Sequence, residues 1–204
     1  MIVLGLQAYI SFALIVFALV PLGRLSMAGR AMVFLIVLAL GIVPLPGGLS
    51  LAGYLRGFTD DLAITTLVWL AAAAIARLGY LPAWPLATRR QLWIGFALAA
   101  LVLYPAALGI GMIDTYRWGF VPRGLIVAAG LLTLLLVLLR NGLGVSMLIA
   151  ATAAFILDLK PSDNFWDYLL DPILAIYAIV ALARDLIIRL RRRRSNGSAM
   201  VARN

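Results

Sequence analysis

Residues 124–157 read GLIVAAGLLTLLLVLLRNGLGVSMLIAATAAFIL, and Arg140 is the single charged residue in this stretch. As one helix, the stretch would be about 50 Å long at 1.5 Å per residue, which exceeds the roughly 30 Å hydrocarbon core of a bilayer. Arg140, Asn141 and Gly142 form a polar, glycine-containing sequence that is typical of a tight turn. The sequence therefore predicts a hairpin of two membrane-spanning helices, residues 124–139 and 142–157.

Five further apolar segments have the character of membrane spans. They cover residues 2–22, 31–46, 62–78, 91–113 and 172–188. The whole chain is 65% apolar and 12% charged, with a mean hydropathy of +1.08, whereas soluble domains average about 25% charged residues. We therefore expect an all-α, polytopic integral membrane helix bundle with seven transmembrane helices. Residues 1–188 would form a single domain, and residues 189–204 a basic, disordered cytoplasmic tail.

The charged residues predict the orientation, because Arg and Lys accumulate in cytoplasmic loops. With the N-terminus outside and the C-terminus in the cytoplasm, the inner side holds thirteen basic residues and one acidic residue, and the outer side holds four and seven. The preference for Arg over Lys, with abundant Ala and Leu, is typical of a GC-rich bacterial genome. We therefore expect a multi-pass protein of the bacterial inner membrane.

The composition excludes several classes of site. The chain has no Cys and no His, so it lacks thiolate and imidazole ligands for zinc, copper, haem or an iron–sulfur cluster. Its one lysine, Lys160, lies in a polar stretch and not inside a late helix, which argues against a retinal Schiff base. No Gly-rich phosphate loop or zinc-protease signature is present. The sequence leaves open whether the protein is an enzyme.

Three predicted outward loops carry most of the polar side chains that the preference of basic residues for the cytoplasmic side does not account for. They cover residues 54–61, 114–120 and 158–171, and all three combine Asp, a basic residue and aromatic rings. Aromatic faces stack on sugar rings, carboxylates and guanidinium groups bind hydroxyls or phosphates, and paired carboxylates can act as acid and base. The candidate catalytic residues are Asp60, Asp61, Asp114, Asp163 and Asp167. The candidate substrate-binding residues are Tyr54, Arg56, Tyr116, Arg117, Trp118, Trp166 and Tyr168.

The third loop also contains a candidate metal site. Asp163, Asp167 and Asp171 are four residues apart, so they would lie on one face if the segment were helical. Such a row could hold Ca²⁺ or Mg²⁺, which prefer oxygen ligands. No other cofactor is expected.

A structural role is the alternative for the same loops. Asp171 followed by Pro172 is typical of a helix start, Ser162 or Asp163 could cap a short interfacial helix, and residues 59–61 could cap the helix at 62–78. The loop aromatics could form the interfacial belt of a membrane protein. The sequence is compatible with both a binding or catalytic role and a structural role for these loops.

The basic cluster at Arg189 and residues 191–194 directly follows the last predicted span. Basic residues at this position attract anionic lipid, at about 1 kcal/mol each near the surface. We therefore expect contact with anionic lipid and not with nucleic acid.

The predicted function is that of an accessory or scaffold subunit in cell-envelope or extracellular-polysaccharide assembly. Such a subunit would have a protein partner in the membrane and could bind a glycan or lipid-linked ligand. One alternative is a membrane-embedded transferase or hydrolase acting on such a ligand at the outer face. A second is a small transporter or flippase component, whose polar path would involve Gln7, Thr65, Thr66 and Pro105. No ionisable residue lies near a predicted helix centre, where transporters usually place one.

Overall fold

The computed structural model describes residues 2–110 and 112–201. Side chains are described for residues 5–110 and 112–192. Within these residues, all named elements of secondary structure are helices. The long helices are α1 (Ile2–Leu19), α2 (Met27–Ile42), α4 (Ile64–Leu78), α5 (Leu86–Ala107), α6 (Arg123–Leu138), α7 (Gly142–Ile156) and α9 (Pro172–Val201). The short ones are α3 (Leu51–Thr59), the 3-10 helix η1 (Tyr116–Gly119) and α8 (Trp166–Leu169). The predicted all-α class is confirmed, and each predicted span corresponds to one long helix.

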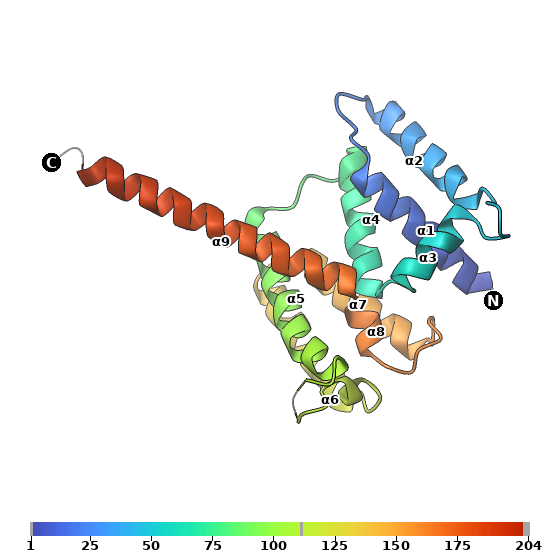
Figure 1. The fold of residues 1–204 in the computed structure, drawn as a ribbon. Helices are drawn as coiled ribbons and strands as arrows, with labels where there is room; N and C mark the ends of the chain where they lie inside the picture. The colour runs from blue at the N-terminus through green and yellow to red at the C-terminus, as the bar shows by residue number, and fades with distance from the viewer. Residues whose placement is uncertain (1, 111, 202–204) are drawn as a thin grey trace.

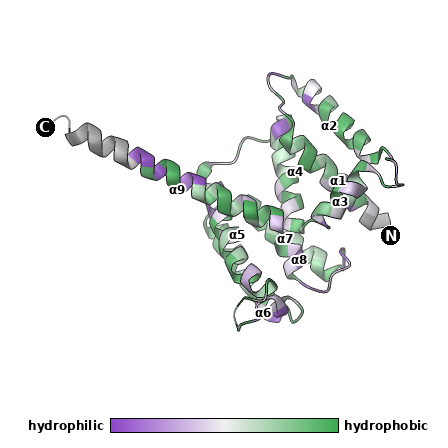
Figure 2. Cartoon of the chain, viewed as in Figure 1, coloured by the Kyte–Doolittle hydropathy of each residue, from purple (hydrophilic) through white to green (hydrophobic). Residues whose placement is uncertain are grey.

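The helices differ in how well they match a bilayer. Among the described residues, α5 is the one helix that is both long and apolar enough to cross a membrane. Shorter apolar helices cover Gly5–Leu19, Met27–Ile42, Ile64–Leu78, Arg123–Leu138 and Gly142–Ile156. Apolar residues dominate these helices along most of their length (Figure 2). By length and composition alone, α5 is compatible with a membrane span.

Local sequence signals explain where several helices begin. The Ser26 hydroxyl accepts a hydrogen bond from the Gly29 amide at 3.2 Å and caps α2. Asn141 Oδ1 accepts one from the Gly144 amide at 3.0 Å and caps α7. Arg140 adopts a left-handed conformation, with φ of 55°, between α6 and α7. The predicted helical hairpin is therefore confirmed.

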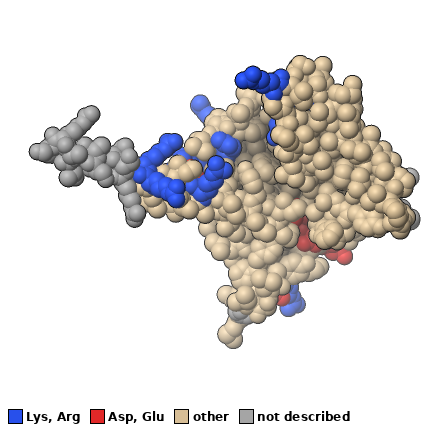
Figure 3. All heavy atoms as spheres, turned by 45° about the horizontal axis from the view of Figure 1, so that its top comes forward, with Lys and Arg blue, Asp and Glu red and all other residues tan. Residues whose placement is uncertain are grey.

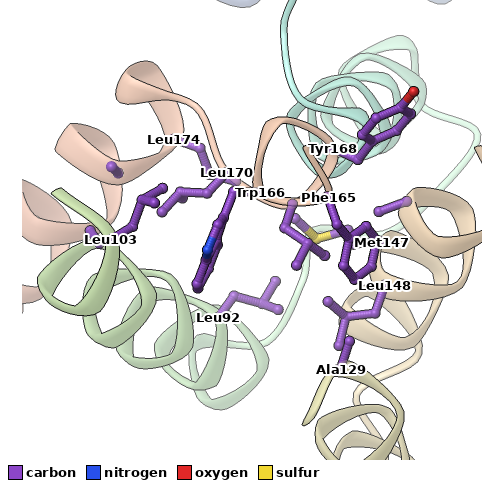
Figure 4. Packing of buried hydrophobic residues seen from close by; sticks show 14 of the residues in the cluster. Leu92, Leu103, Ala129, Met147, Leu148, Phe165, Trp166, Tyr168, Leu170 and Leu174 are labelled. Carbon is purple, nitrogen blue, oxygen red and sulfur yellow. The ribbon is translucent and has the colours of Figure 1, made fainter. Parts of the chain in front are cut away.

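The helices pack mainly in neighbouring pairs, and the short helix α8 lies against α4 and α7. α1 contacts α2, α3 and α4, α7 contacts α4 and α6, and α5 pairs with α9 (Figure 1). Phe165, Trp166 and Tyr168, in and beside α8, insert between these helices and are 0%, 5% and 0% exposed (Figure 4). This buried segment links α5 and α9 to the helices on the other side of the core.

Three predictions differ from the structure. Residues 54–61, predicted as a loop, lie largely in α3, which packs on α1. The predicted interfacial belt is wrong for Phe165, Trp166 and Tyr168, because these side chains fill the core. α9 continues to Val201 and so includes most of the segment predicted as a disordered tail, of which residues 202–204 lie outside the described residues.

Candidate functional site

The predicted outer loops converge on one cavity of about 380 Å³, which we call the rim cavity. Its wall combines the end of α3, the helix η1, the segment around α8 and the start of α9. It is lined by Thr59, Asp60, Asp61, Tyr116, Lys160, Pro161, Ser162, Asp167, Leu170, Asp171 and Pro172. Acidic side chains lie on this side of the molecule, away from the basic side chains around α9 (Figure 3). The structure thus brings together Asp60, Asp61, Asp167 and Tyr116 from the predicted candidates.

Asp171 connects two helices at the base of this cavity. Its Oδ2 accepts a hydrogen bond from the Ala63 amide at 2.9 Å, and its Oδ1 accepts one from the Leu174 amide at 2.8 Å. The predicted cap of α9 is therefore confirmed. The predicted cap of α4 by residues 59–61 is wrong, because Asp171 caps α4 from a distant part of the chain.

Lys160 lies in the wall of the rim cavity, although it was not among the candidate residues predicted from the sequence. Its Nζ donates to the carbonyls of Asp61 at 2.8 Å, Leu62 at 3.1 Å and Asp167 at 2.8 Å. These three bonds use every ammonium proton. Burial lowers the pKa of Lys160 below its ordinary value, while the charge of Asp167 and then of Asp61 acts in the opposite direction. The signal in the sequence was a single lysine in a chain that otherwise uses arginine.

Asp61 has one carboxylate oxygen that the fold leaves without a donor. Its Oδ2 accepts a hydrogen bond from the Arg56 guanidinium at 2.7 Å, and its side chain is 7% exposed. Its Oδ1 is buried and receives no hydrogen bond from any described residue. A buried acceptor without a partner costs free energy, so this atom is a natural contact for a ligand donor.

Two further groups give the cavity both acceptor and donor character. The Ser162 hydroxyl donates to Asp167 Oδ2, which holds that carboxylate in place. Burial, and next the negative charge of Asp167, raise the pKa of Tyr116 above its ordinary value. The Tyr116 phenol therefore stays protonated at neutral pH and can donate a hydrogen bond.

Other candidate residues lie outside the wall of the rim cavity. Asp114 accepts a hydrogen bond from the Arg117 amide at 3.0 Å and stabilises the turn before η1. The Tyr54 hydroxyl donates to the Pro46 carbonyl at 3.0 Å. The remaining candidates outside the wall are Arg56, Arg117, Asp163, Trp118, Trp166 and Tyr168. Trp166 and Tyr168 are core residues, so a surface ligand does not reach their rings.

The predicted carboxylate row does not form. The helix α8 covers only Trp166–Leu169, so Asp163 and Asp171 lie outside it. The expected single helical face is therefore wrong, and the described residues contain no group of three or more His, Cys, Asp or Glu that could hold a metal ion. The start of α8 is capped by Asn164, whose Oδ1 accepts from the Trp166 amide at 2.9 Å, and not by Ser162 or Asp163.

The rim cavity can bind groups that donate hydrogen bonds or carry positive charge. Four carboxylates face one ammonium group, and that ammonium group is already saturated by carbonyls. Comparison with protein-family models, curated proteins and solved structures finds no match to this chain.

Proposed function

We propose that this chain is a seven-span protein of the bacterial inner membrane, with its N-terminus outside and its C-terminus in the cytoplasm. Leu131, Leu134 and Leu138 on α6 are 63%, 62% and 80% exposed, and such apolar surface is favourable in lipid and not in water. Several helices are shorter than the roughly 20 residues of a typical span. Local bilayer thinning or flanking residues would accommodate them at modest cost.

Within that setting, we propose an accessory or scaffold subunit of cell-envelope or extracellular-polysaccharide assembly whose rim cavity binds a hydroxyl-rich glycan group. The observation that carries this proposal is the buried Asp61 Oδ1, which lacks a donor in a cavity lined by other acceptors and Tyr116. A sugar hydroxyl would donate to Asp61, and a neighbouring sugar oxygen would accept from Tyr116. Carboxylates and aromatic rings are well suited to such recognition.

Binding is favoured over catalysis because much of the rim is already used by the fold. Asp171 caps two helices, and Lys160 donates all its protons to carbonyls. The enzyme alternative is supported by one observation: Asp60 and Asp167 line the same cavity, where two carboxylates could serve as acid and base.

The transporter alternative has less support. The Gln7 amide donates to the Leu62 carbonyl at 3.1 Å, and the Thr65 hydroxyl donates to the Leu169 carbonyl at 2.7 Å. These polar groups therefore join helices and are not available to a continuous polar path.

Native mass spectrometry of the gently extracted full-length protein tests the glycan proposal. We expect the wild-type protein to carry a bound glycan or glycolipid, Asp61→Asn to lose it, and the matched control Asp114→Asn to retain it. A folded wild-type protein without a bound glycan would overturn the proposal. Turnover of that ligand by the purified protein, abolished by Asp60→Asn, would favour the enzyme alternative.

Cysteine labelling tests the topology, because the natural chain contains no Cys. Leu49→Cys, Met112→Cys and Leu159→Cys should react with a membrane-impermeant maleimide applied from the periplasmic side. Leu25→Cys and Leu139→Cys should react only after the inner membrane is permeabilised. Periplasmic labelling at position 139 would contradict the α6–α7 hairpin as two spans.

A further inference from the structure

A second hollow, of about 800 Å³, lies between α5 and α9, and we call it the arginine groove. Its charged lining consists of Arg89, Arg90, Arg184, Asp185, Arg189 and Arg192. The rest of its wall is apolar or aromatic and includes Trp93, Tyr177 and Val180. Basic side chains gather along α9 and beside it (Figure 3).

Both walls of the groove change from basic to apolar in the same direction. On α9, Tyr177 and Val180 precede Arg184 at intervals of three and four residues, which places them on one side of the helix. On α5, Trp93 follows Arg89 by one turn. The contact between Arg90 and Asp185 brings the basic parts of the two helices together. The groove therefore has a basic end and an apolar end along the two helices, which is the polarity of a phospholipid.

The positive charge of the groove exceeds what the fold neutralises. Arg90 donates two hydrogen bonds to Asp185, at 2.9 and 2.8 Å, and Arg189 lies 3.0 Å from the same carboxylate. Among the described residues, no carboxylate forms an ion pair with Arg89, Arg184 or Arg192. The Arg89 guanidinium lies over the Trp93 ring, 5.7 Å from its centroid, at the boundary between the charged and apolar parts.

We propose that the arginine groove binds cardiolipin, with its two phosphates at Arg89, Arg184 and Arg192 and its acyl chains against Trp93, Tyr177 and Val180. Three unpaired arginines exceed the single negative charge of one phosphodiester, whereas two phosphates match them better. Basic pockets between membrane helices on the cytoplasmic side are typical cardiolipin sites. The inference rests on the membrane setting of the proposed function and is independent of the glycan ligand.

Lipid titration followed by native mass spectrometry of the delipidated full-length protein in detergent tests this site. The added lipids are cardiolipin, phosphatidylglycerol and phosphatidylcholine. We expect one cardiolipin per chain, bound more tightly than phosphatidylglycerol, with phosphatidylcholine weakest. The triple variant Arg89→Gln/Arg184→Gln/Arg192→Gln should bind cardiolipin about 100-fold more weakly, because each basic residue near the surface contributes roughly fivefold.

A charge-matched control distinguishes a specific lipid-binding site from general electrostatic attraction of anionic lipid to the protein. Arg24→Gln/Arg117→Gln/Arg123→Gln removes the same charge outside the groove and should retain cardiolipin. Equal loss in both triple variants, or equal affinity for phosphatidylglycerol and cardiolipin, would overturn the proposal. Circular dichroism verifies folding, and if the groove triple variant does not fold, Arg184→Gln alone should weaken binding roughly fivefold. Asp61→Asn should leave cardiolipin binding unchanged, so failure of this site is distinguishable from failure of the glycan site.

Discussion

The rim cavity and the arginine groove are both rich in charge, but the fold uses their charges differently. In the rim, Asp171 caps two helices and Lys160 is held by three carbonyls. In the groove, a single aspartate, Asp185, pairs with two arginines, and three more arginines line the hollow without an ion pair to a described residue. Rim charges thus mainly hold the chain together, whereas groove charges remain available to a ligand.

The number of charges at a site is therefore a poor guide to ligand binding. A buried carboxylate that accepts two backbone amide hydrogen bonds is held in place by the fold, whereas an arginine without an ion-pair partner keeps its donors free. The informative atoms are those that the fold leaves unmatched: Asp61 Oδ1 in the rim and the guanidinium groups of the groove. Substitutions in the rim should therefore change stability first, and substitutions in the groove should change binding.

Asp171→Ala should have the largest effect, because it removes charged caps from both α4 and α9. We expect a loss of about 2–4 kcal/mol in the free energy of unfolding, from two caps that are each worth about 1–2 kcal/mol. Denaturant unfolding in detergent, followed by circular dichroism, measures the loss. The control Asp163→Ala, at an exposed position, should change the free energy by less than about 0.5 kcal/mol. Equal effects of the two substitutions would contradict the double cap.

Gly119→Ala should have the next largest effect, since a Cβ at this position would overlap Asn164 Oδ1. The Phe165 amide also donates to the Gly119 carbonyl at 3.0 Å, so η1 and the segment before α8 must stay close. We expect a loss of about 1–3 kcal/mol in the same unfolding measurement. The control Gly124→Ala meets no neighbouring atom within 4 Å and should be neutral or slightly stabilising. A neutral Gly119→Ala would show that the side chains of Asn164 and Trp166 can move aside without cost, which would contradict the close packing at this position.

Asp185→Asn tests the groove in the opposite sense, by adding to its charge surplus. The substitution releases Arg90 and Arg189 from their shared carboxylate, so cardiolipin affinity should rise roughly fivefold. Lipid titration by native mass spectrometry measures the change. Weaker binding would mean that Asp185 is needed to hold the two arginines in position. The charges of the groove would then serve the fold, as those of the rim do.

The pH dependence of the rim is the smallest expected effect. The folded pKa of Lys160 lies below its ordinary value of 10.5, so between these two pKa values the unfolded chain holds a proton that the folded chain has lost. The free energy of unfolding should therefore rise with pH within that window. Denaturant unfolding at a series of pH values should show this slope in the wild-type protein, and Lys160→Met should lack it. The same slope in both proteins would assign it to other groups.

The sequence alone predicts much of the fold because helix formation depends on local signals. The tight turn at Arg140, the apolar segments and the start of α9 after Asp171 all act within a few residues. The candidate site was predicted only in part. Asp60, Asp61, Asp167 and Tyr116 are brought together as the outer loops suggested, but Lys160 was missed, and the metal row of Asp163, Asp167 and Asp171 depended on a helix that does not extend so far.

Local sequence patterns are enough to predict the all-helical class, the positions of the long helices and the separation of basic from acidic residues. Three features depend on the packing of distant segments: Asp171 caps α4 from 108 residues away, Arg90 pairs with Asp185 across 95 residues, and Trp166 lies in the core. These two groups of features differ because the interactions behind them act over different separations along the chain. Backbone hydrogen bonds and caps act between near neighbours in the chain, whereas the partner of a buried charge is set by which helices pack together.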